Sequence, residues 1–173
     1  MHVISRHWTI PISRLKAGAR GFGSGREQLA PMGTFHITTE KAALDLPLIH
    51  RFLAEQSAWA KDIPFDILRR GIEHSLCFGG FLGSSQVAFA RVISDYATFA
   101  NLVDVFVLPE HRGSGHGKAM LTAVVAHPQL QGLRRFTLAT ADAHGLYAQF
   151  GFTAPLKPES LMERYFPYIY AKK

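Results

Sequence analysis

The residues with the clearest chemical potential form a glycine-rich turn that directly follows an apolar segment. Glycine at every second position removes side chains where a ligand could approach the main chain. Amide groups at a helix start have no acceptor within the helix and lie at the positive end of its dipole, so they suit an anion such as a phosphate. The turn consists of Arg112, Gly113, Ser114, Gly115, His116, Gly117 and Lys118.

Two common nucleotide-binding motifs do not fit this turn. A Walker A loop would need a glycine where Arg112 stands and a hydroxyl side chain where Ala119 stands. The dinucleotide pattern Gly-x-Gly-x-x-Gly, counted from Gly113, would need a glycine at Lys118. A phosphate ligand of the turn must therefore belong to another class.

The pattern that does fit is Arg/Gln-x-x-Gly-x-Gly/Ala, which runs from Arg112 to Gly117. A second group, Tyr147-Ala-Gln-Phe-Gly-Phe152, follows the next strand-like segment. Together these motifs resemble the GCN5-related N-acetyltransferase (GNAT) superfamily, and the resemblance extends over roughly residues 35–167. It implies an enzyme that moves an acetyl group from acetyl-CoA to a primary amine by direct attack in a ternary complex.

The resemblance also implies roles for particular residues. The glycine turn would hold the pyrophosphate of coenzyme A, and Tyr147 would protonate the departing sulfur as a general acid. The pantetheine arm would run along the backbone of Val105, Phe106 and Val107, where the fourth and fifth strands of the family's sheet splay apart.

Asp104 interrupts the apolar run 102–108, which predicts a central strand buried on both faces. A carboxylate in such a strand must be paired or functional. The resemblance suggests a general base that acts directly or through water, whereas the structural alternative is a pair with Arg91 or with backbone amides. His144 is a third candidate for proton transfer, and it could equally cap a helix.

Two other kinds of reactive site are not expected. Cys77 stands in an apolar strand-like segment, which is typical of a buried, inert thiol rather than a nucleophile. His111 and His116 lack the spacing and the partners of a metal site, so no metal is predicted.

The hydrophobic pattern predicts an alternation of helices and strands from Phe35 onward. The resemblance implies that they form a single α/β (α+β) domain with a central mixed, mostly antiparallel sheet flanked by helices. Most aromatic residues of its first half are expected in the core: Trp59, Phe65, Phe78, Phe89, Tyr96 and Phe99. The expected strands are 34–39, 75–82, 86–93, 102–108 and 135–140, and the expected helices lie near 44–53, 64–72, 119–127 and 143–150.

Charge and composition divide the chain at about residue 33. Residues 1–31 carry five basic residues and one acidic residue, so most of the formal charge of +6 lies there and the remainder is close to neutral. This distribution argues against a nucleic-acid-binding body and favours a flexible extension, 1–33, before the domain, 34–173. A targeting peptide or an upstream start is an alternative for the extension.

The protein is expected in the cytoplasm, because its single cysteine suits a reducing compartment. No membrane partner is expected, because the sequence has no apolar run long enough to span a membrane. The sequence does not decide whether the acceptor is a small-molecule amine or a peptide amine, and it leaves open whether the protein forms a homodimer. A catalytically silent acyl-CoA-binding module is the alternative function.

Overall fold

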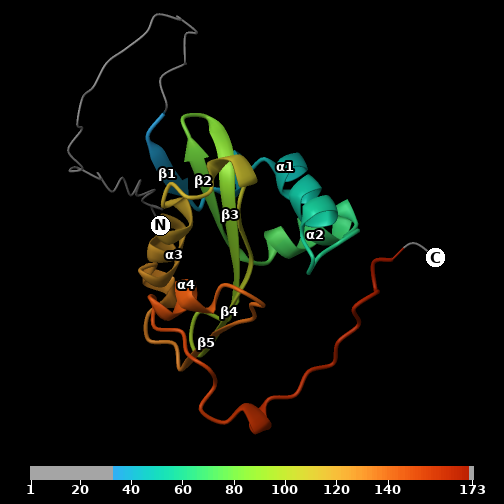
Figure 1. Cartoon of the computed structure of the whole chain (residues 1–173), viewed down its shortest axis with the longest axis vertical. Coiled ribbons are helices and arrows are strands. Elements are labelled where there is room, and N and C mark those ends of the chain that lie inside the picture. The colour runs from blue at the N-terminus through green and yellow to red at the C-terminus, as the bar shows by residue number, and fades with distance from the viewer. Residues whose placement is uncertain (1–32, 172–173) are drawn as a thin grey trace, which may run out of the picture.

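The computed structural model describes residues 33–171, so the predicted N-terminal extension lies almost entirely outside the described residues. A five-stranded sheet forms the middle layer, with two helices on each face (Figure 1). The strands follow one another across the sheet in chain order, and only the last pair is parallel. The predicted mixed, mostly antiparallel sheet between helices is confirmed. Its strands are β1 (Phe35–Thr38), β2 (Leu76–Leu82), β3 (Ser85–Ser94), β4 (Phe99–Val107) and β5 (Arg135–Leu138).

The helices also lie close to where the periodicity predicts them. They are α1 (Leu46–Arg51), α2 (Phe65–Glu73), α3 (His116–Val125) and α4 (His144–Ala148). A π-helical turn, Phe52–Gln56, continues α1 and was not predicted. Gly151, shortly after α4, has a φ of +83°, a left-handed conformation that glycine adopts readily at the end of a helix.

Two hydrophobic cores lie on opposite faces of the sheet. The first contains residues of α1 and α2 together with Cys77, Phe89 and Phe106 from the strands. The second contains the apolar face of α3 and strand residues such as Phe78 and Leu102, with α4 packed against it. The sheet therefore separates an α1/α2 side from an α3/α4 side.

The expectation that most aromatic residues of the first half are buried is wrong for four of the six. Phe78 and Phe89 are buried, whereas Trp59, Phe65, Tyr96 and Phe99 are exposed. Trp59 lies in the α1–α2 connection, and Tyr96 and Phe99 lie at the β3–β4 turn. Both positions are at the margins of the α1/α2 side, where no helix covers the chain.

Strand β4 is less buried than its composition predicts. Only Ala100, Leu102 and Phe106 are buried, and most of its other residues are half-buried. The reason is its short neighbour, because β5 pairs with residues 99–102 alone. From Val103 onward, β4 has β3 on one side and no strand on the other. The sheet is therefore open between β4 and β5, as the resemblance implied.

Candidate active site

A β-bulge in β4 sets the direction of the side chains around the opening in the sheet. Phe106 pairs with Phe89, but Val103 pairs with Arg91, so Asp104 and Val105 together lie opposite one residue of β3. Asp104 has a φ of +55°, which is uncommon for a residue with a side chain and more tolerable for Asp than for most. Bulges of this kind re-aim side chains next to functional sites.

The bulge changes which residues face each side of the sheet. Before it, Ala100 and Leu102 belong to the α3/α4 core, whereas beyond it Val105 and Val107 pack there. Phe106 belongs to the α1/α2 core. Asp104 is thereby directed toward the α1/α2 side, where its partners lie.

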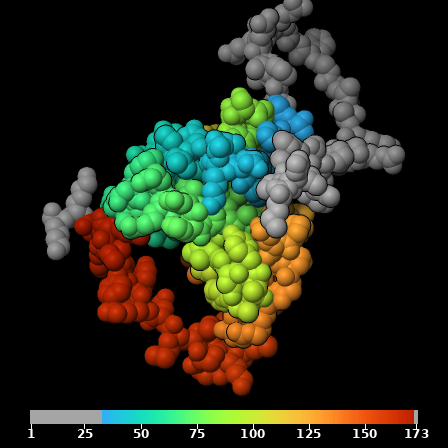
Figure 2. All heavy atoms as spheres, turned by 180° about the vertical axis from the view of Figure 1, so that it is seen from behind, coloured from blue at the N-terminus to red at the C-terminus, as the bar shows by residue number. Residues whose placement is uncertain are grey.

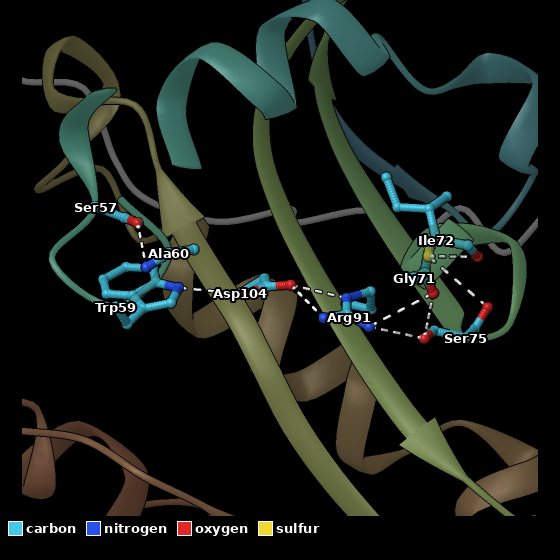
Figure 3. A network of polar contacts seen from close by, with 9 residues as sticks. Ser57, Trp59, Ala60, Gly71, Ile72, Ser75, Arg91 and Asp104 are labelled. Atoms are coloured by element: carbon cyan, nitrogen blue, oxygen red, sulfur yellow. Dashed lines mark hydrogen bonds and ion pairs between the residues drawn. The ribbon is translucent and has the colours of Figure 1, made fainter. Parts of the chain in front are cut away.

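Asp104 is held by two side chains that come from different elements (Figure 3). Its Oδ2 accepts from Arg91, with Nε at 2.8 Å and Nη2 at 2.7 Å, and its Oδ1 accepts from Nε1 of Trp59 at 3.3 Å. The pair is mostly buried, with 16% of the Arg91 side chain and 9% of the Asp104 side chain exposed. The contact of the structural alternative, a pair with Arg91, is therefore present.

Arg91 extends this network to the end of α2. Its Nη1 donates to the hydroxyl of Ser75 at 3.1 Å and lies 3.5 Å from the carbonyl of Gly71. The planar guanidinium thus joins the bulged strand to the helix that packs above it. The sequence offered no signal for the contact with Trp59, because 45 residues separate it from Asp104.

The glycine turn follows the end of β4 after Leu108 and one 3-10 turn, Pro109–His111. Gly113 and Gly115 have φ values of +78° and +84°, and a side chain added at either would meet no atom of the protein within 4 Å. Gly115 caps α3 without a side-chain hydrogen bond. A Cβ at Gly117 would lie 3.8 Å from Val107, so the turn lies against the strand end.

The main-chain amides of this turn have no partner within residues 33–171. No acceptor there is found for the amides of residues 113–118, and the first helical bond of α3 is donated by Ala119 to the carbonyl of Gly115. The N-terminus of α3 therefore presents unpaired donors at the positive end of a ten-residue helix. This is the arrangement that binds phosphate groups.

The side chains of the turn fix its position. Arg112 donates from Nε to the carbonyl of Val107 at 2.9 Å, so part of its guanidinium anchors the turn to β4. His116 stacks on Phe35 of β1, with ring centroids 4.2 Å apart. Burial lowers the pKa of His116, and the nearby His111 lowers it further, which favours the neutral ring.

Tyr147 lies on the same side of the sheet as the glycine turn. It packs against the α3/α4 core together with Val105 and Val107, and its ring meets Phe152 edge-on. Burial, and to a smaller degree Asp142, raises the pKa of its hydroxyl, so the group keeps its proton at neutral pH. His144 is exposed at the start of α4.

A cavity of about 270 Å³ lies beside Trp59 on the other side of the sheet. One wall is the α1–α2 connection, with Ala58, Trp59 and Lys61, and the other is the end of the chain, with Tyr165 and Tyr170 among its residues. Trp59 links this cavity to the bulge, because its ring lines the cavity and its Nε1 donates to Asp104. In the part of the chain that the structure describes, no cluster of His, Cys, Asp or Glu could hold a metal ion.

Comparison with known proteins identifies the class. Residues 73–154 match the family model described as an acetyltransferase (GNAT) domain. A protein of Gibberella zeae, provisionally named an acetyltransferase, is 33% identical over 139 residues, which cover 68% of this chain and 77% of the relative. The chain therefore belongs to the GNAT acetyltransferase family, whose members use acetyl-CoA.

Solved structures agree with this assignment. A crystal structure from Xanthomonas campestris pv. campestris, described as a protein of the GNAT family with a provisional acetyltransferase assignment, is 64% identical. It covers 82% of this chain and 99% of its own, with a TM-score of 0.79. N-acetylglutamate synthase from Neisseria gonorrhoeae, solved with coenzyme A and N-acetyl-glutamate, shares the fold. It is 18% identical, has a TM-score of 0.59, and covers 75% of this chain and 31% of its own.

None of the helices within residues 33–171 has the length and apolar character to cross a membrane.

We expect the Cys77 thiol of the native protein to be inert. Cys77 is fully buried, and burial raises its pKa to about 11, so the thiol stays protonated from neutral pH to about pH 10. Maleimide at pH 7–8 should leave the folded chain unmodified and label it once in urea. Rapid labelling of the folded protein would contradict this and would reopen a nucleophilic role for Cys77.

Proposed function

We propose that this protein is an acetyl-CoA-dependent N-acetyltransferase that acts on a primary amine by direct attack in a ternary complex. One observation carries the proposal. The amides of residues 113–118, which have no acceptor within residues 33–171, lie at the N-terminus of α3 and against the end of the part of β4 that has no neighbouring strand on its β5 side. An anion site and an open strand edge are thus continuous.

The residues of this region suit the two parts of coenzyme A. The amides and Lys118 would hold the diphosphate, and the free edge of β4 at residues 105–107 would bind the amide groups of the pantetheine arm. The carbonyl of Val107 already accepts from Arg112, so we assign the pantetheine contacts mainly to the other main-chain groups of this stretch. Acetyl-CoA supplies the acyl group as a thioester.

The two candidate catalytic residues lie on opposite faces of the sheet. Tyr147 packs on the α3/α4 side with Val105, whereas Asp104 points to Arg91 and Trp59 on the α1/α2 side. Groups on opposite faces can act on one reaction only where the sheet is open, which is the gap between β4 and β5. We therefore infer that the donor enters from the α3/α4 side and the amine from the cavity beside Trp59.

Each residue then has a distinct proton to handle. Tyr147, protonated at neutral pH, would donate its hydroxyl proton to the departing sulfur. Asp104 would accept the proton that the amine loses, directly or through water, while Arg91 and Trp59 hold the carboxylate in place. The main-chain groups that leave the β-ladder at the bulge are suited to stabilise the oxyanion.

Removing the Tyr147 hydroxyl should slow turnover without weakening acetyl-CoA binding. We expect Tyr147→Phe to lower kcat at least about tenfold, because a positioned general acid typically contributes about 10²–10⁴-fold. Thiol release measures turnover, and calorimetry measures binding. The matched control is Tyr168→Phe, which alters a hydroxyl on a mostly exposed side chain outside the site. Equal turnover in wild type and Tyr147→Phe would refute the assignment.

The general-acid role also predicts the alkaline limb of the pH profile. The active form is the protonated phenol, and burial raises its pKa above the usual value of 10. The fall in kcat that accompanies deprotonation of the Tyr147 hydroxyl should therefore occur only as the pH rises through this raised pKa. The pH profile of kcat for Tyr147→Phe should lack that fall.

Gly115→Val should abolish coenzyme A binding. A β-branched residue at a φ of +84° distorts the turn and places methyl groups where the diphosphate would lie. Gly132→Val is a matched control, because Gly132 has a φ of +75° and equally open surroundings away from the turn. Thermal unfolding should show similar losses in the two variants, and calorimetry should show lost affinity only in Gly115→Val. Unchanged affinity there would count against the turn.

Two variants that break the same ion pair separate the two roles of Asp104. Asp104→Asn removes the proton acceptor, whereas Arg91→Gln leaves the carboxylate in place. If Asp104 is the base, Asp104→Asn should lower kcat by about 10²–10⁴-fold and Arg91→Gln by much less, at comparable losses of thermal stability. Equal losses of kcat would assign Asp104 to the structural role alone.

A further inference from the structure

The cavity beside Trp59 has walls that are mainly aromatic. Trp59 comes from the α1–α2 connection, and Tyr165, Phe166 and Tyr170 come from the end of the described chain. Figure 2 shows that end, in red, returning to the body of the domain beyond an open gap. Aromatic walls of this kind favour a ligand with a flat, apolar body that can stack against them.

The charge around the cavity is positive. Among the described residues, Lys61 is the one charged group that lines it, and no ion pair of Lys61 is found there. The guanidinium of Arg164 lies over the ring of Phe166, 5.2 Å from its centroid, so a second cation lies at this wall. Asp62 and Glu163, the acidic neighbours of these cations in the sequence, do not line the cavity. An anionic group of a ligand would therefore be attracted, and a cationic one repelled.

The size of the cavity suits a small molecule. Its volume of about 270 Å³ is close to the lower limit of small-molecule sites, which typically measure about 300–1,000 Å³. A compound with a single aromatic ring and two short substituents matches this space better than a stretch of polypeptide does.

Trp59 gives such a ligand a direction. Its Nε1 donates to Asp104, the proposed base, while its ring lines the cavity. An amine that loses its proton to Asp104 must lie at that edge of the indole. Because Lys61 lines the cavity and Asp104 does not, the anionic group belongs at the other end of the molecule.

We propose that the acceptor is a small primary amine with an aromatic body and an anionic group at the end away from the nitrogen, and that Lys61 selects it. The same charges disfavour polyamines, whose remaining nitrogens are cationic. This inference rests on the proposed function, because it names the acceptor of that reaction.

Lys61 takes no part in the chemical steps. The amine nitrogen bonds to the acetyl carbon as the C–S bond breaks, the proton of the nitrogen passes to Asp104, and Tyr147 protonates the sulfur. Lys61 acts only on which amine is bound, so its replacement should change KM and leave kcat nearly unaltered.

Three primary amines that differ only at the far end test the charge preference. They are 4-(aminomethyl)benzoate, which is anionic there, the neutral 4-(aminomethyl)benzamide and the cationic 1,4-bis(aminomethyl)benzene. The fluorescence of Trp59 reports binding without turnover, in a Trp8→Phe protein where it is the only tryptophan. The titrations are run with and without coenzyme A.

We expect the benzoate to bind at least about threefold more tightly than the benzamide, and the diamine to bind most weakly, because a charge-assisted contact is stronger than a neutral one. Lys61→Gln should make the Kd values of the benzoate and the benzamide equal. Lys157→Gln, which changes an exposed lysine outside the cavity, is the matched control and should preserve the difference.

Equal affinity for the three compounds, no fluorescence response to any of them, or an unchanged preference in Lys61→Gln would overturn the proposal. Thiol release from acetyl-CoA separates it from the proposed function. Turnover of only the diamine or a peptide amine would overturn the acceptor class and keep the enzyme. Binding in the expected order, with no thiol release from any amine, would contradict the proposed function and still support an anion-selective cavity.

Discussion

The constraint on which the site depends is the single extra residue in β4. An extra residue in one strand of an antiparallel pair reverses the alternation of side chains beyond it. Here that reversal directs Asp104 away from the α3/α4 core and toward Arg91 and Trp59. Asp104 holds a left-handed backbone conformation there, which typically costs on the order of 1–3 kcal/mol. The ion pair with Arg91 and the hydrogen bond from Trp59 hold the carboxylate in this position.

The bulge and the short fifth strand act together. Residues 100–102 of β4 are paired on both sides, and the pairing with β5 ends at Leu102, just before the bulge. Three features consequently lie near one gap in the sheet. They are the open edge of β4, the N-terminus of α3 with its amides that have no partner within residues 33–171, and Tyr147, whose hydroxyl keeps its proton. A continuous sheet would separate the two helical layers completely. In the proposed mechanism, the opening is what allows groups from both layers to serve one reaction.

The last described residues differ from the rest of the domain in how little they are packed. The sheet and its helices bury apolar side chains on both faces. Residues 153–169 are exposed, and Tyr170 packs against the α1/α2 core. Near the end of this segment, residues 165–170 meet the α1–α2 connection, where several of them line the cavity beside Trp59.

Local patterns in the sequence determined the order of the elements, the glycine turn and the short helix with Tyr147, because each depends on residues near one another in the chain. The inert environment of Cys77 followed from its apolar strand in the same way. Other features depended on pairs distant in sequence. The position of a bulge depends on how two strands pair with each other. No local pattern therefore indicated that Asp104 would face the α1/α2 side. Likewise, Trp59 and Phe99 are large aromatic residues of the kind that usually lies in a core, and only the tertiary structure shows that they are exposed, in the α1–α2 connection and at the start of β4.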